Sequence, residues 1–100
     1  MVRAIPVTRI RSTEGDRPGA VEFRRMPGQS NICGIAFRCP CGCGLESYLP
    51  VHSPGAKSTG SLEWEFNGDE VNSTTTPSIL QIGLPCKWHG FLTNGEFAPC

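Results

Sequence analysis

The sequence predicts a small all-β domain, in which one zinc ion stabilises a sheet of the zinc-ribbon type that ends in a C-terminal hairpin. Apolar and polar residues alternate with a period of two in several short segments, as they do in half-buried strands. No window of about ten residues shows helical periodicity, and 12 glycines and 9 prolines interrupt most candidate helices. The length of 100 residues corresponds to a single domain spanning 1–100.

Two of the expected strands precede the first cysteine cluster. Val21 and Phe23 alternate with charged residues, which predicts a strand with one buried face. Cys33, Ile35 and Phe37 share one face of the following segment. We therefore expect a second strand that leads directly into the cluster.

The later strands are expected at 62–66, at 79–84 and in a C-terminal hairpin. In residues 62–66 apolar side chains alternate with two glutamates, which predicts a half-buried strand. The hairpin is indicated by Asn94-Gly95 between two short apolar segments. Asn-Gly supplies the two positive φ angles that a type I′ turn requires.

Two clusters of potential metal ligands are the strongest functional signal in the chain. Cys39, Cys41 and Cys43 alternate in one turn rich in glycine and proline, and Cys86 and His89 lie in a second such turn. Structural zinc is held in tetrahedral geometry by Cys and His side chains, usually from two tight turns. The spacing therefore predicts a zinc site with three thiolates and one imidazole.

The five candidates exceed the four ligand positions of a tetrahedral site. We favour Cys41, Cys43, Cys86 and His89, with Cys39 able to replace Cys41 or Cys43. A thiolate-rich site with four protein ligands keeps no open position for water. We therefore expect a structural metal and predict no catalytic residue.

A disulfide framework is the alternative interpretation, because the six cysteines are even in number. The first ten residues do not resemble a secretory signal, which favours a reducing cytoplasm. Three cysteines at alternate positions are also too crowded for separate unstrained disulfides. Cys33 lies among apolar residues and is expected to be a small core residue, and Cys100 is left outside the site.

The net charge is zero, but the charges are distributed unevenly. The second half of the chain is acidic, whereas all seven arginines precede the first cysteine cluster. Such an asymmetry can mark a surface for nucleic acid or for an acidic partner, although strand arginines are usually just solvated. The arginines are Arg3, Arg9, Arg11, Arg17, Arg24, Arg25 and Arg38.

Two polar features receive structural interpretations. Pro77-Ser78-Ile79 is interpreted as the start of a strand with Ile79 in the core, although a Ser78 hydroxyl beside a rigid turn could also serve recognition. His52 lies in a predicted loop with no paired nucleophile or carboxylate, so we assign it no catalytic role.

The order of these motifs resembles an uncharacterised family of small bacterial and phage zinc-binding domains, some of which carry an ammonia monooxygenase label that their sequences do not support. The resemblance rests on Cys39-Pro-Cys-Gly-Cys-Gly44, on Pro77-Ser78-Ile79 and on Cys86-Lys-Trp-His-Gly90, and extends from about Ile35 to the C-terminus. It implies a compact zinc-bound β domain with Cys39, Cys41, Cys43, Cys86 and His89 as the metal cluster. Thr74-Thr75-Thr76 departs from the apolar residue that family members often have before the Pro-Ser-Ile element.

Together these features predict a non-enzymatic zinc-binding module that mediates protein interaction, in the cytoplasm or, for a phage-encoded accessory protein, in the host cytoplasm. A nucleic-acid-binding module that uses the arginine-rich half is one alternative, and a zinc-dependent hydrolase is another. No apolar segment approaches the ~20 residues of a membrane span, so no membrane partner is expected. The sequence does not indicate the oligomeric state.

Overall fold

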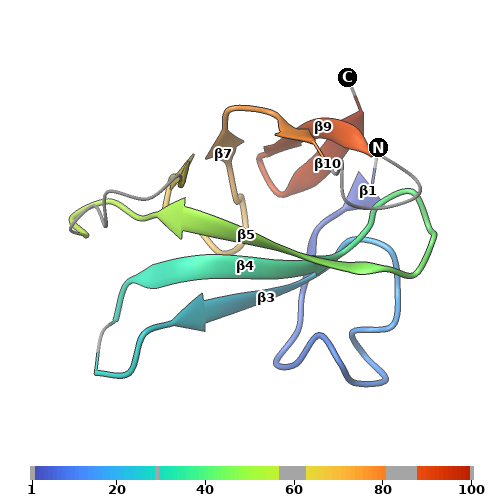
Figure 1. Ribbon diagram of the computed structural model, residues 1–100, viewed down its shortest axis with the longest axis horizontal. Helices are drawn as coiled ribbons and strands as arrows, with labels where there is room; N and C mark the ends of the chain where they lie inside the picture. Colours follow the sequence, from blue (N-terminus) through green and yellow to red (C-terminus); the bar gives the residue numbers. More distant parts are fainter. Residues whose placement is uncertain (1, 29, 57–62, 81–87, 100) are drawn as a thin grey trace.

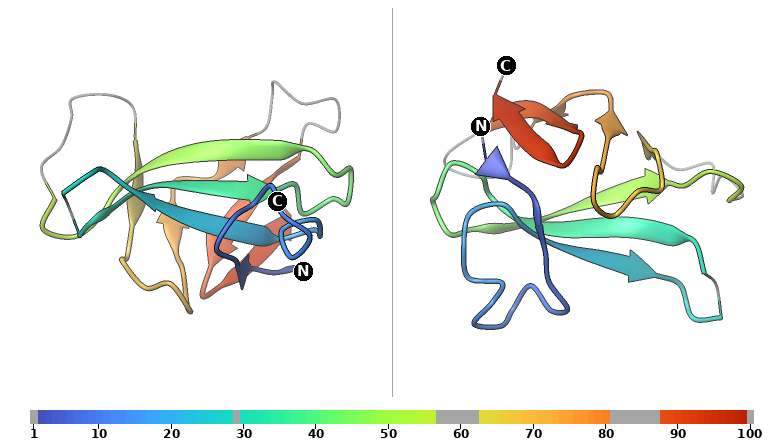
Figure 2. Two further views of the ribbon diagram at one scale, coloured as in Figure 1. Left: turned by 90° about the horizontal axis from the view of Figure 1, so that it is seen from below. Right: turned by 180° about the vertical axis from the view of Figure 1, so that it is seen from behind.

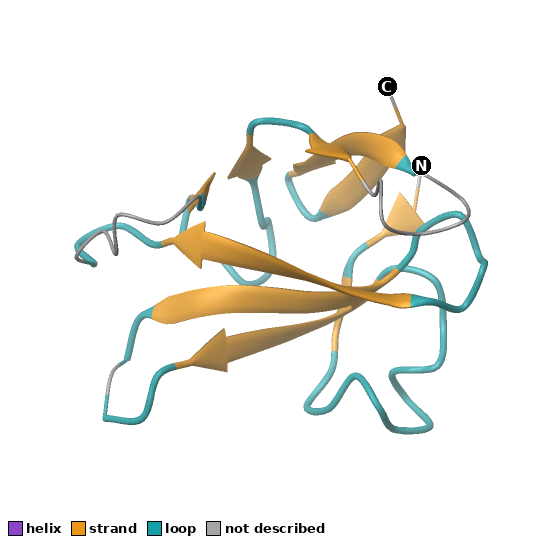
Figure 3. Ribbon diagram, in the orientation of Figure 1, coloured by secondary structure: helices purple, strands orange, loops and turns teal. Residues whose placement is uncertain are grey.

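The computed structural model describes residues 2–28, 30–56, 63–80 and 88–99. Every regular element among them is a β-strand (Figure 3), which confirms the predicted all-β class. No helix in these ranges is long and apolar enough to cross a membrane. The strands are β1 (Val2–Arg3), β2 (Ile5–Pro6), β3 (Ala20–Arg25), β4 (Ile32–Arg38), β5 (Glu46–His52), β6 (Trp64–Phe66), β7 (Thr75–Thr76), β8 (Ile79–Leu80), β9 (His89–Thr93) and β10 (Glu96–Pro99).

The larger sheet has six strands in the order β2-β3-β4-β5-β6-β7, and its centre is the long antiparallel meander of β3, β4 and β5 (Figure 1). Strands β3 and β4 coincide with the two segments predicted from alternation. Strand β5 was not predicted, and it pairs along its length with β4, from Pro50 opposite Gly34 to Glu46 opposite Arg38. The cysteine turn therefore connects the two central strands of this sheet.

The smaller sheet has four strands in the order β1-β10-β9-β8. Its centre is the predicted C-terminal hairpin of β9 and β10. Asn94 and Gly95 have φ angles of 50° and 76°, which agrees with the expected type I′ turn. Strand β8 pairs antiparallel with β9, with Ile79 opposite Gly90 and Leu80 opposite His89.

The two sheets pack face to face, and the core lies between them (Figure 2). The ring of Phe37 from β4 stacks on that of Phe97 from β10, with centroids 5.5 Å apart. Trp88 meets Phe97 edge to face at 5.9 Å, and Ile79 and Leu92 are buried in the same cluster. Aromatic pairs at these spacings contribute about 0.5–1.5 kcal/mol beyond the burial of their area.

The chain passes from one sheet to the other at Pro77-Ser78. Strand β7 forms one edge of the six-stranded sheet, and β8 forms one edge of the four-stranded sheet. Only these two residues separate the strands. The position of Ser78 is therefore fixed by one sheet on its N-terminal side and by the other sheet on its C-terminal side. Trp64 on β6 adds a further restraint, because its indole Nε1–H donates to the carbonyl oxygen of Ser78 at 3.2 Å.

Candidate functional site

The cysteine turn brings three of the predicted metal ligands together. The sulfur atoms of Cys39, Cys41 and Cys43 all lie within 4.8 Å of one another, and those of Cys39 and Cys41 are 3.2 Å apart. Cys39 is fully buried at the end of β4, whereas Cys41 and Cys43 are exposed. One thiol therefore contacts the core, and two are presented at the surface beside it.

Backbone geometry explains why this turn converges. Gly42 and Gly44 have φ angles of 92° and 81°, a backbone conformation that residues with a Cβ atom rarely adopt. The N–H of Cys39 donates to Leu45 O at 2.9 Å, and the N–H of Gly42 donates to Cys39 O at 3.2 Å. These hydrogen bonds make the connection between β4 and β5 compact. The side chains of Cys39, Cys41 and Cys43 therefore converge.

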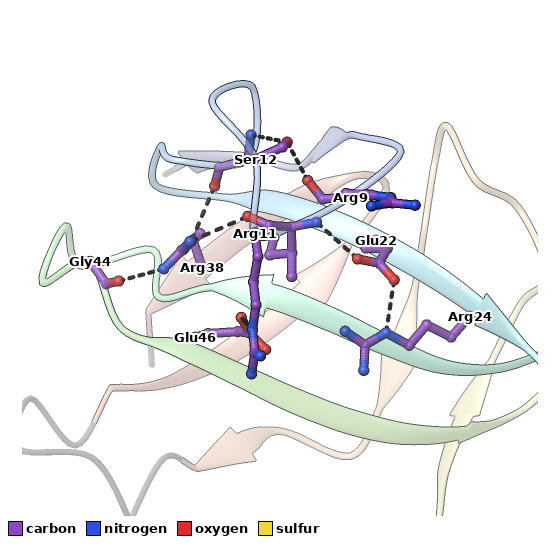
Figure 4. A network of polar contacts seen from close by, with 10 residues as sticks. Arg9, Arg11, Ser12, Glu22, Arg24, Arg38, Gly44 and Glu46 are labelled. Atoms are coloured by element: carbon purple, nitrogen blue, oxygen red, sulfur yellow. Dashed lines mark hydrogen bonds and ion pairs between the residues drawn. The ribbon is translucent and has the colours of Figure 1, made fainter.

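Arg38 fastens the cysteine turn to the N-terminal loop (Figure 4). Its Nε–H donates to Gly15 O at 3.2 Å, its Nη1–H to Gly44 O at 2.9 Å and its Nη2–H to Ile10 O at 3.3 Å. A guanidinium group carries five N–H donors in a fixed planar arrangement, which suits it to joining several carbonyls. The cysteine turn is therefore stabilised by the Arg38 side chain, which bonds it to the N-terminal loop, as well as by its own backbone hydrogen bonds.

The three thiols fit a zinc ion by donor type and by spacing. Zinc–sulfur bonds of about 2.3 Å in tetrahedral geometry place sulfur atoms roughly 3.8 Å apart, which small side-chain rotations reach from the observed cluster. Within the described ranges the cluster comprises Cys39, Cys41 and Cys43, and it includes neither Cys33 nor His89. Cys86 lies outside the described residues and stays the predicted ligand of the second turn.

His89 instead contacts a hydroxyl group. Its Nε2 atom lies 3.0 Å from Oγ of Ser78. When the ring proton is on Nδ1, the hydroxyl donates to Nε2. A serine hydroxyl bonded to an imidazole nitrogen at this distance is the arrangement by which a histidine activates a serine nucleophile.

The register of the four-stranded sheet produces this pair. Alternate residues of β9 face outward, so His89 is exposed while Gly90 and Leu92 are buried. His89 lies opposite Leu80, and the half-buried Ser78 lies two residues before Leu80, immediately before β8. The pair therefore forms between the residue that precedes β8 and the first residue of β9, where the chain passes from one sheet to the other.

The structure confirms one of the two meanings considered for Pro77-Ser78-Ile79 and adds another. Ile79 is 3% exposed in the core, as the strand interpretation predicts. The Ser78–His89 contact was missed, because the two residues are eleven positions apart in the sequence and no local signal indicates that they pair. The contact could have been predicted only by pairing the strand that follows Pro77-Ser78 with the first strand of the Asn-Gly hairpin.

His52, the last residue of β5, makes polar contacts that do not involve Ser78 or His89. Its Nε2 is 2.8 Å from Ala56 O, and its Nδ1 is 3.2 Å from a carboxylate oxygen of Glu65. Both contacts favour the protonated ring, so the Ala56 carbonyl and then Glu65 raise the pKa of His52 above 6.5. We keep it outside the candidate catalytic pair.

We expect an NMR titration to show the pKa of His52 above the ordinary value of 6.5, and lowered by Glu65→Gln. A raised pKa in the folded state means that the contact stabilises the fold fully below the unfolded-state pKa. This contribution is lost as the pH rises through the folded-state value. A pKa of His52 at or below 6.5, or one that does not respond to Glu65→Gln, would contradict the observed contacts.

The arginine-rich half contains several ion pairs, two of which are drawn in Figure 4. These arginines therefore lie in a surface of mixed charge, and exposed pairs of this kind contribute about 0–1 kcal/mol each. The pairs are Arg11 with Glu46 at 3.0 Å, Arg24 with Glu22 at 2.8 Å and Arg25 with Glu70 at 3.2 Å.

Comparison with known proteins identifies a family for the chain. Residues 9–100 match the family described as "Bacterial ubiquitination-like system serine protease (BubE)". No curated protein and no solved structure matches the chain. The match contradicts the prediction that the protein is not an enzyme. That prediction was wrong because it rested on a closed, thiolate-rich zinc site and assigned His89 to the metal, so that no nucleophile with a base was apparent. The chain belongs to the BubE family, which is described as the serine protease of a bacterial ubiquitination-like system.

Proposed function

We propose that this protein is a serine protease of a bacterial ubiquitination-like system, with Ser78 as the nucleophile and His89 as the general base. The observation that carries the proposal is the 3.0 Å contact between Ser78 Oγ and His89 Nε2. The family match supports the reaction class. Under this proposal the protein partners are its substrates and the other components of the pathway.

The chemistry follows from the two side chains. His89 Nε2 accepts the hydroxyl proton as Ser78 Oγ attacks the carbonyl carbon of an amide bond, which gives a tetrahedral intermediate. The intermediate collapses, His89 returns the proton to the leaving amine, and an ester to Ser78 remains. Water then attacks this ester while His89 takes its proton, and the proton passes back to Ser78 Oγ as the carboxylic acid leaves.

The fold holds the nucleophile in place before substrate arrives. Trp64 Nε1–H fixes the carbonyl oxygen of Ser78, and Ile79 anchors the next residue in the core. A nucleophile held between two sheets loses little conformational freedom when it reacts, which lowers the barrier. Trp64 therefore acts on the reaction through the backbone of Ser78.

We assign the cysteine cluster a structural role. The proposed zinc ligands are Cys39, Cys41 and Cys43, with Cys86 as the predicted fourth, so that His89 is left for Ser78. Four thiolates give a closed site, which would stabilise the fold and would leave the proton transfers to His89. Such thiolates persist in a reducing compartment, so we propose that the protein acts in the cytoplasm.

Hydrolysis of p-nitrophenyl acetate tests the proposal without knowledge of the natural substrate. We expect the protein to release p-nitrophenolate faster than buffer does, and phenylmethylsulfonyl fluoride to stop this by modifying one serine. A thermal melt of the modified protein should match that of the untreated protein. Activity that resists the sulfonyl fluoride and disappears with a zinc chelator would favour a zinc-dependent hydrolase instead.

A further inference from the structure

Two large apolar side chains flank the Ser78–His89 pair on the outer face of the four-stranded sheet. Leu80 is 52% exposed and Phe91 is 42% exposed. Leu80 lies directly opposite His89, and Phe91 follows His89 by two residues on the same face of β9. Ile79 and Gly90 point the other way and are buried.

The distances of Leu80 and Phe91 from His89 are similar to the interval between side chains on one face of an extended polypeptide. Directly opposed residues of antiparallel strands have Cβ atoms about 4.5–5.5 Å apart, and residues two apart on one strand are separated by about 7 Å. Leu80 and Phe91 are therefore each within one side-chain length of His89. An extended polypeptide also presents side chains of one face at about 7 Å intervals.

We propose that Leu80 and Phe91 form a subsite for an apolar side chain of the substrate residue next to the bond that Ser78 attacks. The inference rests on the proposed function, and it adds a preference for one class of substrate. The subsite adjoins the catalytic pair, because Leu80 lies opposite His89 and Phe91 follows His89 on the same face of β9.

The position of these residues distinguishes them from other exposed apolar residues. Single exposed apolar side chains are common on protein surfaces and need no explanation. Met26 and Val71 are of this kind, since they lie on separate connections. Leu80 and Phe91 instead share one face with a nucleophile and its base, and burying them under substrate removes apolar area from water.

The test compares the p-nitrophenyl esters of N-acetyl-L-leucine and N-acetylglycine, which differ in one side chain. Rates are divided by the uncatalysed rate of each ester to remove differences in reactivity. We expect kcat/KM for the leucine ester to exceed that for the glycine ester by about tenfold or more, the lower end of the discrimination that enzymes achieve through apolar contacts with a substrate side chain. Leu80→Ser and Phe91→Ser should each move this ratio toward one, whereas Val71→Ser, a matched change at an exposed site, should keep it.

The outcomes separate this inference from the proposed function. Hydrolysis that depends on Ser78 with equal rates for both esters overturns the subsite and keeps the nucleophile. Equal hydrolysis by the native protein and by Ser78→Ala overturns the proposed function, and the subsite with it. Light scattering provides a further check. A dimer that Leu80→Ser converts to a monomer would assign this face to a second copy of the chain and overturn the subsite.

Discussion

Replacing Ser78 with alanine is expected to lower hydrolytic activity by about 10⁴-fold or more, because the acyl ester can then no longer form. The hydroxyl is half-buried at a strand corner and contacts His89. Its loss should change the free energy of unfolding by only about 0.5 kcal/mol, as for most surface substitutions. Steady-state ester hydrolysis and a thermal melt of the same preparation measure both quantities.

His89→Ala should reduce activity to a similar extent, and the double variant should be scarcely slower than either single variant. This non-additivity is expected because the two groups act in one step. Ser30→Ala and His52→Ala are matched controls at sites away from the pair, and both should retain activity. Losses that simply add in the double variant would show that Ser78 and His89 do not act together.

Chelating the proposed zinc ion is expected to unfold most of the protein. Structural zinc contributes on the order of 10–16 kcal/mol of apparent binding free energy in small zinc peptides. This is comparable to the free energy of unfolding of a whole domain, which is ~5–15 kcal/mol. Cys41→Ser removes one exposed thiol of the cluster. We expect it to abolish stoichiometric zinc and the cooperative thermal transition, as measured by elemental analysis and circular dichroism.

Cys33→Ala supplies the control for the metal experiment. Cys33 lies on the neighbouring strand β4 and is not part of the sulfur cluster, so the zinc content should stay at about one per chain. If a reductant unfolded the native protein and a chelator did not, the disulfide interpretation would replace the metal. Full zinc content in Cys41→Ser would remove Cys41 from the site.

The elements that the sequence predicted are those whose signal is local. Asn94-Gly95 defines its turn through the backbone of two residues, and the alternation in β3 and β4 reports one buried face. Strand β5 was missed because Pro50 interrupts it and because its polar ends resemble a loop. Its place in the sheet depends on pairing with β4, which is a long-range property.

The candidate site shows the same division between local and long-range information. Cys39, Cys41 and Cys43 converge within one turn, and their spacing alone predicted a cluster. The spacing of Cys86 and His89 is also typical of zinc ligands, but the outward face of β9 brings His89 to Ser78. That contact depends on the register of β8 against β9, which no short motif encodes.

The central claim is that Ser78 is a nucleophile activated by His89, and covalent labelling tests it most directly. The protein is treated with a fluorophosphonate, digested and mapped by mass spectrometry, and the rate of labelling is compared with that of His89→Ala. We predict one adduct per chain, on Ser78, formed at least about 100-fold more slowly in the variant, as expected when a general base is removed. An adduct on another residue, or equal labelling rates in the two proteins, would contradict the claim.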